Sequence, residues 1–124
     1  MLFRSWMITR EEIFDFVKDK YNIKPDYPWE KYSNYAALRH KDNKKWFGLV
    51  MDITSDKIGL NTDEHIDVIN LKVRKEFIGP LRKKEGFYRA YHMDKSNWIT
   101  INLKEINTIN EIKDLIAESY ELTT

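Results

Sequence analysis

The chain has 124 residues, and its 21 Lys and Arg against 20 Asp and Glu leave a formal net charge of +1. Because it contains no cysteine, it cannot form disulfides, thiolate metal sites or a cysteine nucleophile. The near-neutral charge argues against attraction of the whole molecule to nucleic acid or to an anionic membrane, but it is compatible with a local basic surface.

The length and the 42% of hydrophobic residues predict one domain over residues 1–124 with a buried core. Residues 1–6 are expected to form an N-terminal extension. No apolar run approaches the length of a membrane span, and charged residues come too early for a signal peptide. We therefore expect a cytoplasmic protein without a membrane partner.

The first predicted element is a helix over residues 9–22. Thr9 and Glu12 have the spacing of a capping box, in which each side chain bonds to the backbone amide of the other residue. Apolar residues then recur at helical spacing. Asn22 suits a left-handed C-cap, and Pro25 prevents the helix from continuing.

Residues 24–34 form an aromatic-rich loop that contains two prolines. Its aromatic side chains are too apolar for a freely moving segment. We expect them to pack over a sheet edge or to form the rim of a pocket. They are Tyr27, Trp29 and Tyr32, with Tyr35 directly after the loop.

Residues 36–40 and 45–53 are predicted to form a β-hairpin whose turn at 42–44 contains Asp and Asn. Alternation along the second strand places Phe47, Leu49, Met51 and Ile53 on one face and Trp46, Gly48, Val50 and Asp52 on the other. A third strand over residues 65–73 is partly apolar on both faces, which predicts a central position in the sheet.

A helix is predicted over residues 74–85, but Pro80 lies inside it and must either kink it or split it into two short turns. Strands over residues 88–93 and 98–103 follow, joined by a turn at 94–97. A second capping box at Thr108 begins the last helix.

The predicted order is therefore α-β-β-β-α-β-β-α. Short connections make both hairpins antiparallel. The predicted fold class is α+β, an antiparallel sheet with helices mainly on one face.

Several short motifs together resemble the MmcQ/YjbR family, over roughly residues 7–122. They are Tyr27-Pro28-Trp29-Glu30, Leu38-Arg39-His40-Lys41, Lys45-Trp46-Phe47, Val68-Ile69-Asn70-Leu71-Lys72, Ala90-Tyr91-His92-Met93 and Trp98-Ile99-Thr100. The resemblance implies a secretion-chaperone-like fold and DNA binding, and it supplies no catalytic residues. The chain departs from the family pattern at Gly79-Pro80, where a continuous helix is more usual.

Basic residues on the hairpin turns and on the middle helix are the candidate nucleic-acid-binding residues, because lysine and arginine contact phosphates. They are Lys41, Lys44, Lys45, Lys72, Arg74, Lys75, Arg82, Lys83, Lys84, Arg89 and Lys95. Aromatic residues and one histidine are the candidate ligand- or partner-binding residues. They are Trp29, Trp46, Tyr91, His92 and Trp98.

No catalytic residue, metal site or cofactor is predicted. The three histidines, His40, His65 and His92, are far apart in the sequence, and the glycines form no phosphate-binding loop. Ser96, near His92 and Asp94, is better explained by local turn bonds than by a catalytic triad.

The leading hypothesis is a non-catalytic DNA-binding module. One alternative is a protein-interaction or homodimerisation module that uses the aromatic sheet face. Another is a small-ligand or enzymatic pocket near His92.

Overall fold

The computed structural model describes residues 8–124, and the expected extension at residues 1–6 lies outside the described part. The elements are α1 (Arg10–Tyr21), β1 (Ala36–Arg39), β2 (Trp46–Thr54), η1 (Ser55–Ile58), β3 (His65–Lys72), η2 (Lys75–Phe77), α2 (Ile78–Arg82), β4 (Phe87–Arg89), β5 (Trp98–Asn102), η3 (Leu103–Glu105), η4 (Ile109–Glu111) and α3 (Lys113–Leu122). The η elements are short 3₁₀ turns. None of the helices within residues 8–124 is long and apolar enough to cross a membrane.

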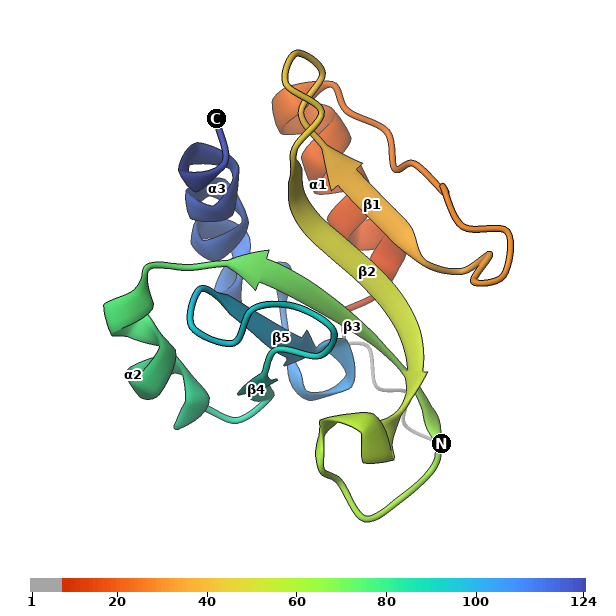
Figure 1. Ribbon diagram of the computed structural model, residues 1–124, viewed down its shortest axis with the longest axis vertical. Coiled ribbons are helices and arrows are strands. Elements are labelled where there is room, and N and C mark those ends of the chain that lie inside the picture. The colour runs from red at the N-terminus through yellow and green to blue at the C-terminus, as the bar shows by residue number, and fades with distance from the viewer. Residues whose placement is uncertain (1–7) are drawn as a thin grey trace.

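The strands form one five-stranded antiparallel sheet in the order β1-β2-β3-β5-β4. The predicted α+β class and element order are confirmed, and β3 holds the predicted central position. In Figure 1, α1 and α3 lie behind the strands, and the loop that follows β4 crosses in front of β5. The sheet therefore has a helix-covered face and a loop-covered face.

The caps of α1 follow from the residues at its two ends. The amide of Glu12 donates to the Thr9 hydroxyl at 3.3 Å, and the Thr9 amide donates to the Glu12 carboxylate at 3.2 Å. Asn22 ends the helix in the left-handed conformation, with φ of 57°. Ile13 and Val17 are fully buried and fix the helix against the sheet.

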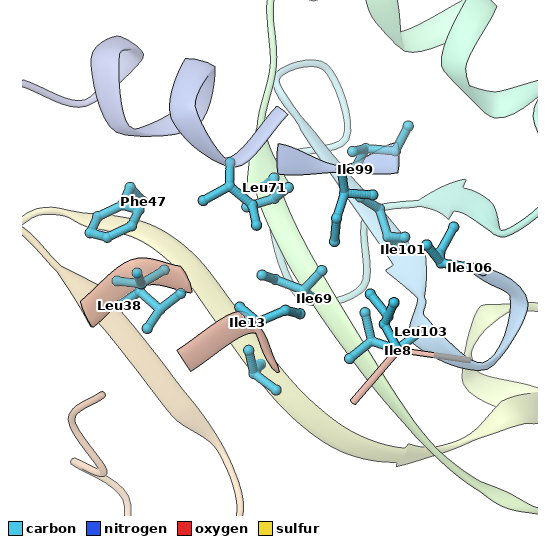
Figure 2. Close-up of a cluster of buried hydrophobic side chains, with 14 of the residues drawn as sticks. Ile8, Ile13, Leu38, Phe47, Ile69, Leu71, Ile99, Ile101, Leu103 and Ile106 are labelled. Atoms are coloured by element: carbon cyan, nitrogen blue, oxygen red, sulfur yellow. The ribbon is translucent and has the colours of Figure 1, made fainter. Parts of the chain in front are cut away.

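The main hydrophobic core fills the space between the helices and the helix-covered face. Figure 2 shows the central strands contributing Ile69, Leu71, Ile99 and Ile101, with Ile13 of α1 facing them. Each of these side chains is completely buried. Removing such a side chain typically costs about 2–5 kcal/mol, so this core sets most of the stability of the fold.

A β-bulge at Phe47 changes the expected faces of β2. Leu38 pairs with Gly48 and Arg39 pairs with Trp46, so Phe47 is the extra residue of the bulge. The expectation that Phe47 shares a face with Leu49, Met51 and Ile53 is therefore wrong. Phe47 joins the core under the helices, whereas those three residues form a second cluster on the loop-covered face.

The same bulge corrects the expected position of Asp52. Strict alternation predicts that Asp52 shares a face with Trp46, but Val50, two residues before Asp52, packs in the main core, and Trp46 packs in the second cluster. Asp52 pairs across the strands with Asp67, close to α1.

Two other expectations concern the second half of the chain. The predicted middle helix is split, as Pro80 requires, into η2 and the short α2. The strand predicted over residues 88–93 ends at Arg89. From Ala90 onward the chain leaves the sheet and crosses the face opposite the helices, where Asn70 bonds to the carbonyl of Tyr91.

Candidate functional site

Strand register gathers most of the predicted basic residues at one end of the sheet. Arg39 pairs with Trp46 at the tip of the first hairpin, Lys72 pairs with Trp98, and Arg89 pairs with Ile99. We call this region the lysine-rich end. It comprises Lys41, Lys44, Lys45, Lys72, Arg74, Lys75, Arg89 and Lys95.

The remaining predicted basic residues lie elsewhere. Arg82 ends α2, and Lys83 and Lys84 lead toward Phe87, which pairs with Ile101 rather than with the start of β5. Lys84 lines a hollow with Glu64 and Glu111. These three residues lie at and after the end of α2 rather than at the ends of the strands.

Most cations of the lysine-rich end have no acidic partner in the described part of the chain. Within residues 8–124 the only ion pair of this set joins Arg74 to Glu118, at 4.0 Å. Lys41, Lys44 and Lys45 are exposed on the hairpin tip. Their charges are thus available to an anionic partner.

The hairpin tip is held in place by the end of α3. The Asn43 side chain donates to the carbonyl of Thr123 at 3.1 Å, and the His40 ring bonds to the Thr123 hydroxyl at 2.8 Å. His40 is buried and packs on Tyr120 with ring centroids 4.1 Å apart. These contacts fix the position of the tip, and they give His40 a structural role.

A pocket of about 340 Å³ lies on the loop-covered face beside the lysine-rich end. It is lined by Trp29, Tyr32, Tyr35, Trp46, Leu49, Met51, His92, Met93 and Asp94. Trp29 meets Trp46 edge to face at 5.3 Å between ring centroids, and Tyr32 stacks on Tyr35 at 4.8 Å. We call this hollow the aromatic pocket.

One wall of the aromatic pocket is the predicted aromatic loop, which is anchored at both ends. Near its start, Asp26 and Ala37 exchange two backbone hydrogen bonds of 2.9 and 2.8 Å. Near its end, Arg10 of α1 donates to the carbonyl of Asn34 at 2.8 Å and forms a bidentate pair with Asp67. The loop therefore packs over the sheet, as expected.

The opposite wall is the loop between β4 and β5, which buried polar side chains attach to the sheet. Asn70 donates to the carbonyl of Tyr91 at 2.8 Å, and the amide of Tyr91 donates to the Thr100 hydroxyl at 2.9 Å. Thr100 in turn donates to Asn70, and both residues are completely buried. Such a fully bonded network fixes the loop in one position.

His92 lies at the pocket in a strained backbone conformation, with φ of 66°. Left-handed backbone costs a residue other than glycine about 1–3 kcal/mol, and it concentrates at functional sites. The exposed ring packs on Tyr91 at 3.8 Å between centroids. The histidine ring hydrogen bonds within residues 8–124 are those of His40 and His65, so the ring nitrogens of His92 are open to a ligand.

Asp94 contributes a carboxylate at the edge of the pocket. Its Oδ1 accepts from the Ser96 amide at 3.0 Å and from the Ser96 hydroxyl at 2.8 Å, which are the local turn bonds expected there. These two hydrogen bonds lower the pKa of Asp94 below its ordinary value, and the one from the Ser96 backbone amide contributes more than the one from the Ser96 hydroxyl.

Of the predicted ligand-binding residues, Trp29, Trp46 and His92 line the pocket, whereas Tyr91 and Trp98 do not. Sequence reasoning missed Leu49, Met51, Met93 and Asp94 as pocket residues. Tyr32 and Tyr35 also line the pocket, and they belong to the aromatic side chains that were expected to pack over a sheet edge or to form the rim of a pocket. Nothing in the sequence placed the Met93 and Asp94 side chains opposite them.

Other polar residues contact one another within the molecule. In the acidic loop before β3, Glu64 pairs with Lys104 at 2.6 Å and His65 bonds to Asp52 at 2.9 Å. Within residues 8–124 no three His, Asp or Glu side chains form a group suited to a metal ion. A larger, polar hollow of about 520 Å³ beside β4 contains Glu105, which already accepts from Asn102 at 2.8 Å and from Tyr88.

Comparisons with known proteins place the whole fold in one family. The YjbR family model matches residues 9–122. YyaQ, an uncharacterized protein of Bacillus subtilis (strain 168), is 50% identical over 117 residues, which cover 94% of this chain and 99% of that protein.

Solved structures share the fold. A crystal structure of a Pseudomonas syringae protein has a TM-score of 0.91 at 50% identity and covers 94% of this chain and 100% of its own. A Deinococcus radiodurans crystal structure, of the family-model domain DUF419, shares the fold with a TM-score of 0.70 at 17% identity, over 97% of this chain and 81% of its own. The chain therefore belongs to the YjbR family.

Proposed function

We propose that this protein is a non-catalytic nucleic-acid-binding module that contacts phosphates with its lysine-rich end. The observation that carries the proposal is the gathering of cations, most without an acidic partner within residues 8–124, on the hairpin tip, after β3 and before β5. Cations of this kind supply most of the non-specific affinity of proteins for nucleic acid.

The near-neutral charge of the whole chain is compatible with this role. The total of +1 includes the cations of the lysine-rich end, the carboxylates that lie among them, such as Asp42, Glu76 and Asp94, and carboxylates elsewhere, such as Asp63 and Glu64 of the acidic loop. A phosphate backbone responds to the local field within roughly one Debye length, about 8 Å at physiological salt, rather than to the total charge.

Binding is tested by fluorescence anisotropy with labelled oligonucleotides at low and at physiological salt. We expect binding that weakens steeply as salt increases, because phosphate contacts release counterions. Lys41→Glu and Lys45→Glu are expected to weaken binding to all sequences alike, and loss of each phosphate contact reduces the salt slope by about 1.

Lys57→Glu is the matched control. Lys57 is equally exposed and undergoes the same change of charge, but it lies in η1, at the far end of β2 from the hairpin tip. It should leave binding nearly unchanged. Absence of binding at low salt, or equal effects of all three variants, would contradict the proposal.

A further inference from the structure

The aromatic pocket directly adjoins the lysine-rich end. Trp46 follows Lys45 and lines the pocket, and Asp94 lines it on the other side. Lys72 and Lys95 lie close enough to Asp94 to contribute to the lowering of its pKa. A ligand in this pocket therefore lies beside positive charge, which favours a ligand that joins a flat apolar group to an anionic one.

The volume and lining of the pocket suit one planar ring system. Its volume of about 340 Å³ is at the lower end of the range of roughly 300–1,000 Å³ for small-ligand sites. Apart from His92 and Asp94 the lining is apolar, and Trp29, Tyr32 and Tyr35 supply aromatic faces. Aromatic faces of this kind stack on nucleic-acid bases irrespective of their sequence.

Asp94 supplies the polar edge that such a ring would meet. Its Oδ1 is engaged by Ser96, while its Oδ2 accepts no hydrogen bond from any residue within 8–124. An ionised carboxylate only accepts hydrogen bonds. It therefore favours a base that presents an amino group, such as cytosine with its N4, over one that presents a carbonyl oxygen there, such as thymine with its O4.

We propose that the aromatic pocket receives one unpaired base of a single-stranded nucleic acid, and that Asp94 favours bases with an amino group. The flanking phosphates lie on Lys45, Lys72 and Lys95. The inference rests on the proposed nucleic-acid binding and names the form of nucleic acid that is preferred. A base that is stacked and paired in a duplex cannot enter the pocket, so single strands bind more tightly than duplexes.

The test compares oligo(dC), oligo(dT) and a duplex of mixed sequence by anisotropy on the full chain. Tyr32→Ala removes a ring that lines the pocket, and Tyr27→Ala removes a ring of the same loop that does not. Both tyrosines are about half exposed, at 48% and 50%, so neither change should unfold the protein. Tyr32→Ala should weaken oligo(dC) binding roughly 5- to 150-fold, the usual effect of losing one stacked ring, and Tyr27→Ala should have little effect.

Asp94→Asn tests the base preference. The wild-type protein should bind oligo(dC) more tightly than oligo(dT), and the variant should lose the difference because an amide donates to O4 as readily as it accepts from N4. Oligo(rC) and oligo(rU) should follow the same order, since uracil presents the same O4 as thymine and the pocket contacts the base.

The outcomes separate this inference from the proposed function. Duplex bound as tightly as single strands, or equal effects of the two tyrosine variants, would overturn the base pocket while leaving phosphate binding intact. Free deoxycytidine monophosphate bound as tightly as oligo(dC) would overturn the preference for a strand and assign the pocket to nucleotides. Failure of every oligonucleotide to bind at low salt would overturn both.

Discussion

Gly86 and Gly79 have different requirements although they are only seven residues apart. Gly86 has a φ of +92°, and a Cβ there would lie 3.0 Å from the Ile106 side chain. Gly79 lies in α2 directly before Pro80, and beyond its chain neighbours and its own helix backbone an added Cβ would meet no atom of residues 8–124 within 4 Å. The first residue is glycine because the turn into β4 needs it, whereas at the second a Cβ would be crowded only by the ring of the following proline, which disfavours helical backbone before it.

Gly86→Ala should therefore destabilise the protein by about 1–3 kcal/mol, the cost of left-handed backbone for a residue with a side chain. Gly79→Ala should change the stability by less than about 1 kcal/mol, because the helix preference of alanine is offset by the crowding of its Cβ against the following proline. Urea denaturation of both variants measures the two changes. Equal destabilisation by the two substitutions would contradict this account.

At the scale of elements, Arg10 joins α1, β3 and the aromatic loop. Its guanidinium forms two bonds to Asp67, of 3.0 and 2.8 Å, and one to the carbonyl of Asn34. The side chain is only 14% exposed, so its bonds are well shielded from water. Arg39 makes a comparable contact with Asp26 at 2.8 Å, but both of those side chains are about 40% exposed.

Arg10→Met should cost roughly 1–3 kcal/mol of unfolding free energy, since charge-assisted bonds are lost and Asp67 loses its bidentate partner. Arg39→Met should cost less than about 1 kcal/mol, as exposed ion pairs do. Thermal denaturation followed by circular dichroism provides the comparison. A larger effect at Arg39 would contradict the role assigned to Arg10.

Local signals predicted the elements well where neighbours in the sequence decide the structure. The capping box at Thr9, the C-cap at Asn22 and the split of the middle helix shortly before Pro80 each depend on residues a few positions apart. Where contacts between residues far apart in the sequence decide the structure, the alternation of apolar and polar residues did not predict it. The bulge at Phe47 shifts the register of a strand, and the partners of Tyr91 are Asn70 and Thr100.

For the molecule as a whole, the sequence predicted the fold class and the residue types of the site, but not their arrangement. The lysine-rich end results from strand register, which brings the tip of the first hairpin and the start of β5 to the same end of the sheet. The aromatic pocket forms between two loops that are far apart in the chain, one before β1 and the other after β4. Neither arrangement follows from spacing along the chain.

The strand order has a consequence for how the protein is made. β5 lies between β3 and β4 in the sheet, yet it is the last strand to leave the ribosome. Until residues 98–102 have been synthesised, β4 has no partner and β3 presents an open edge with apolar side chains. Open edges of this kind associate with other chains. A chain that stops at residue 97 should therefore aggregate, which light scattering would detect.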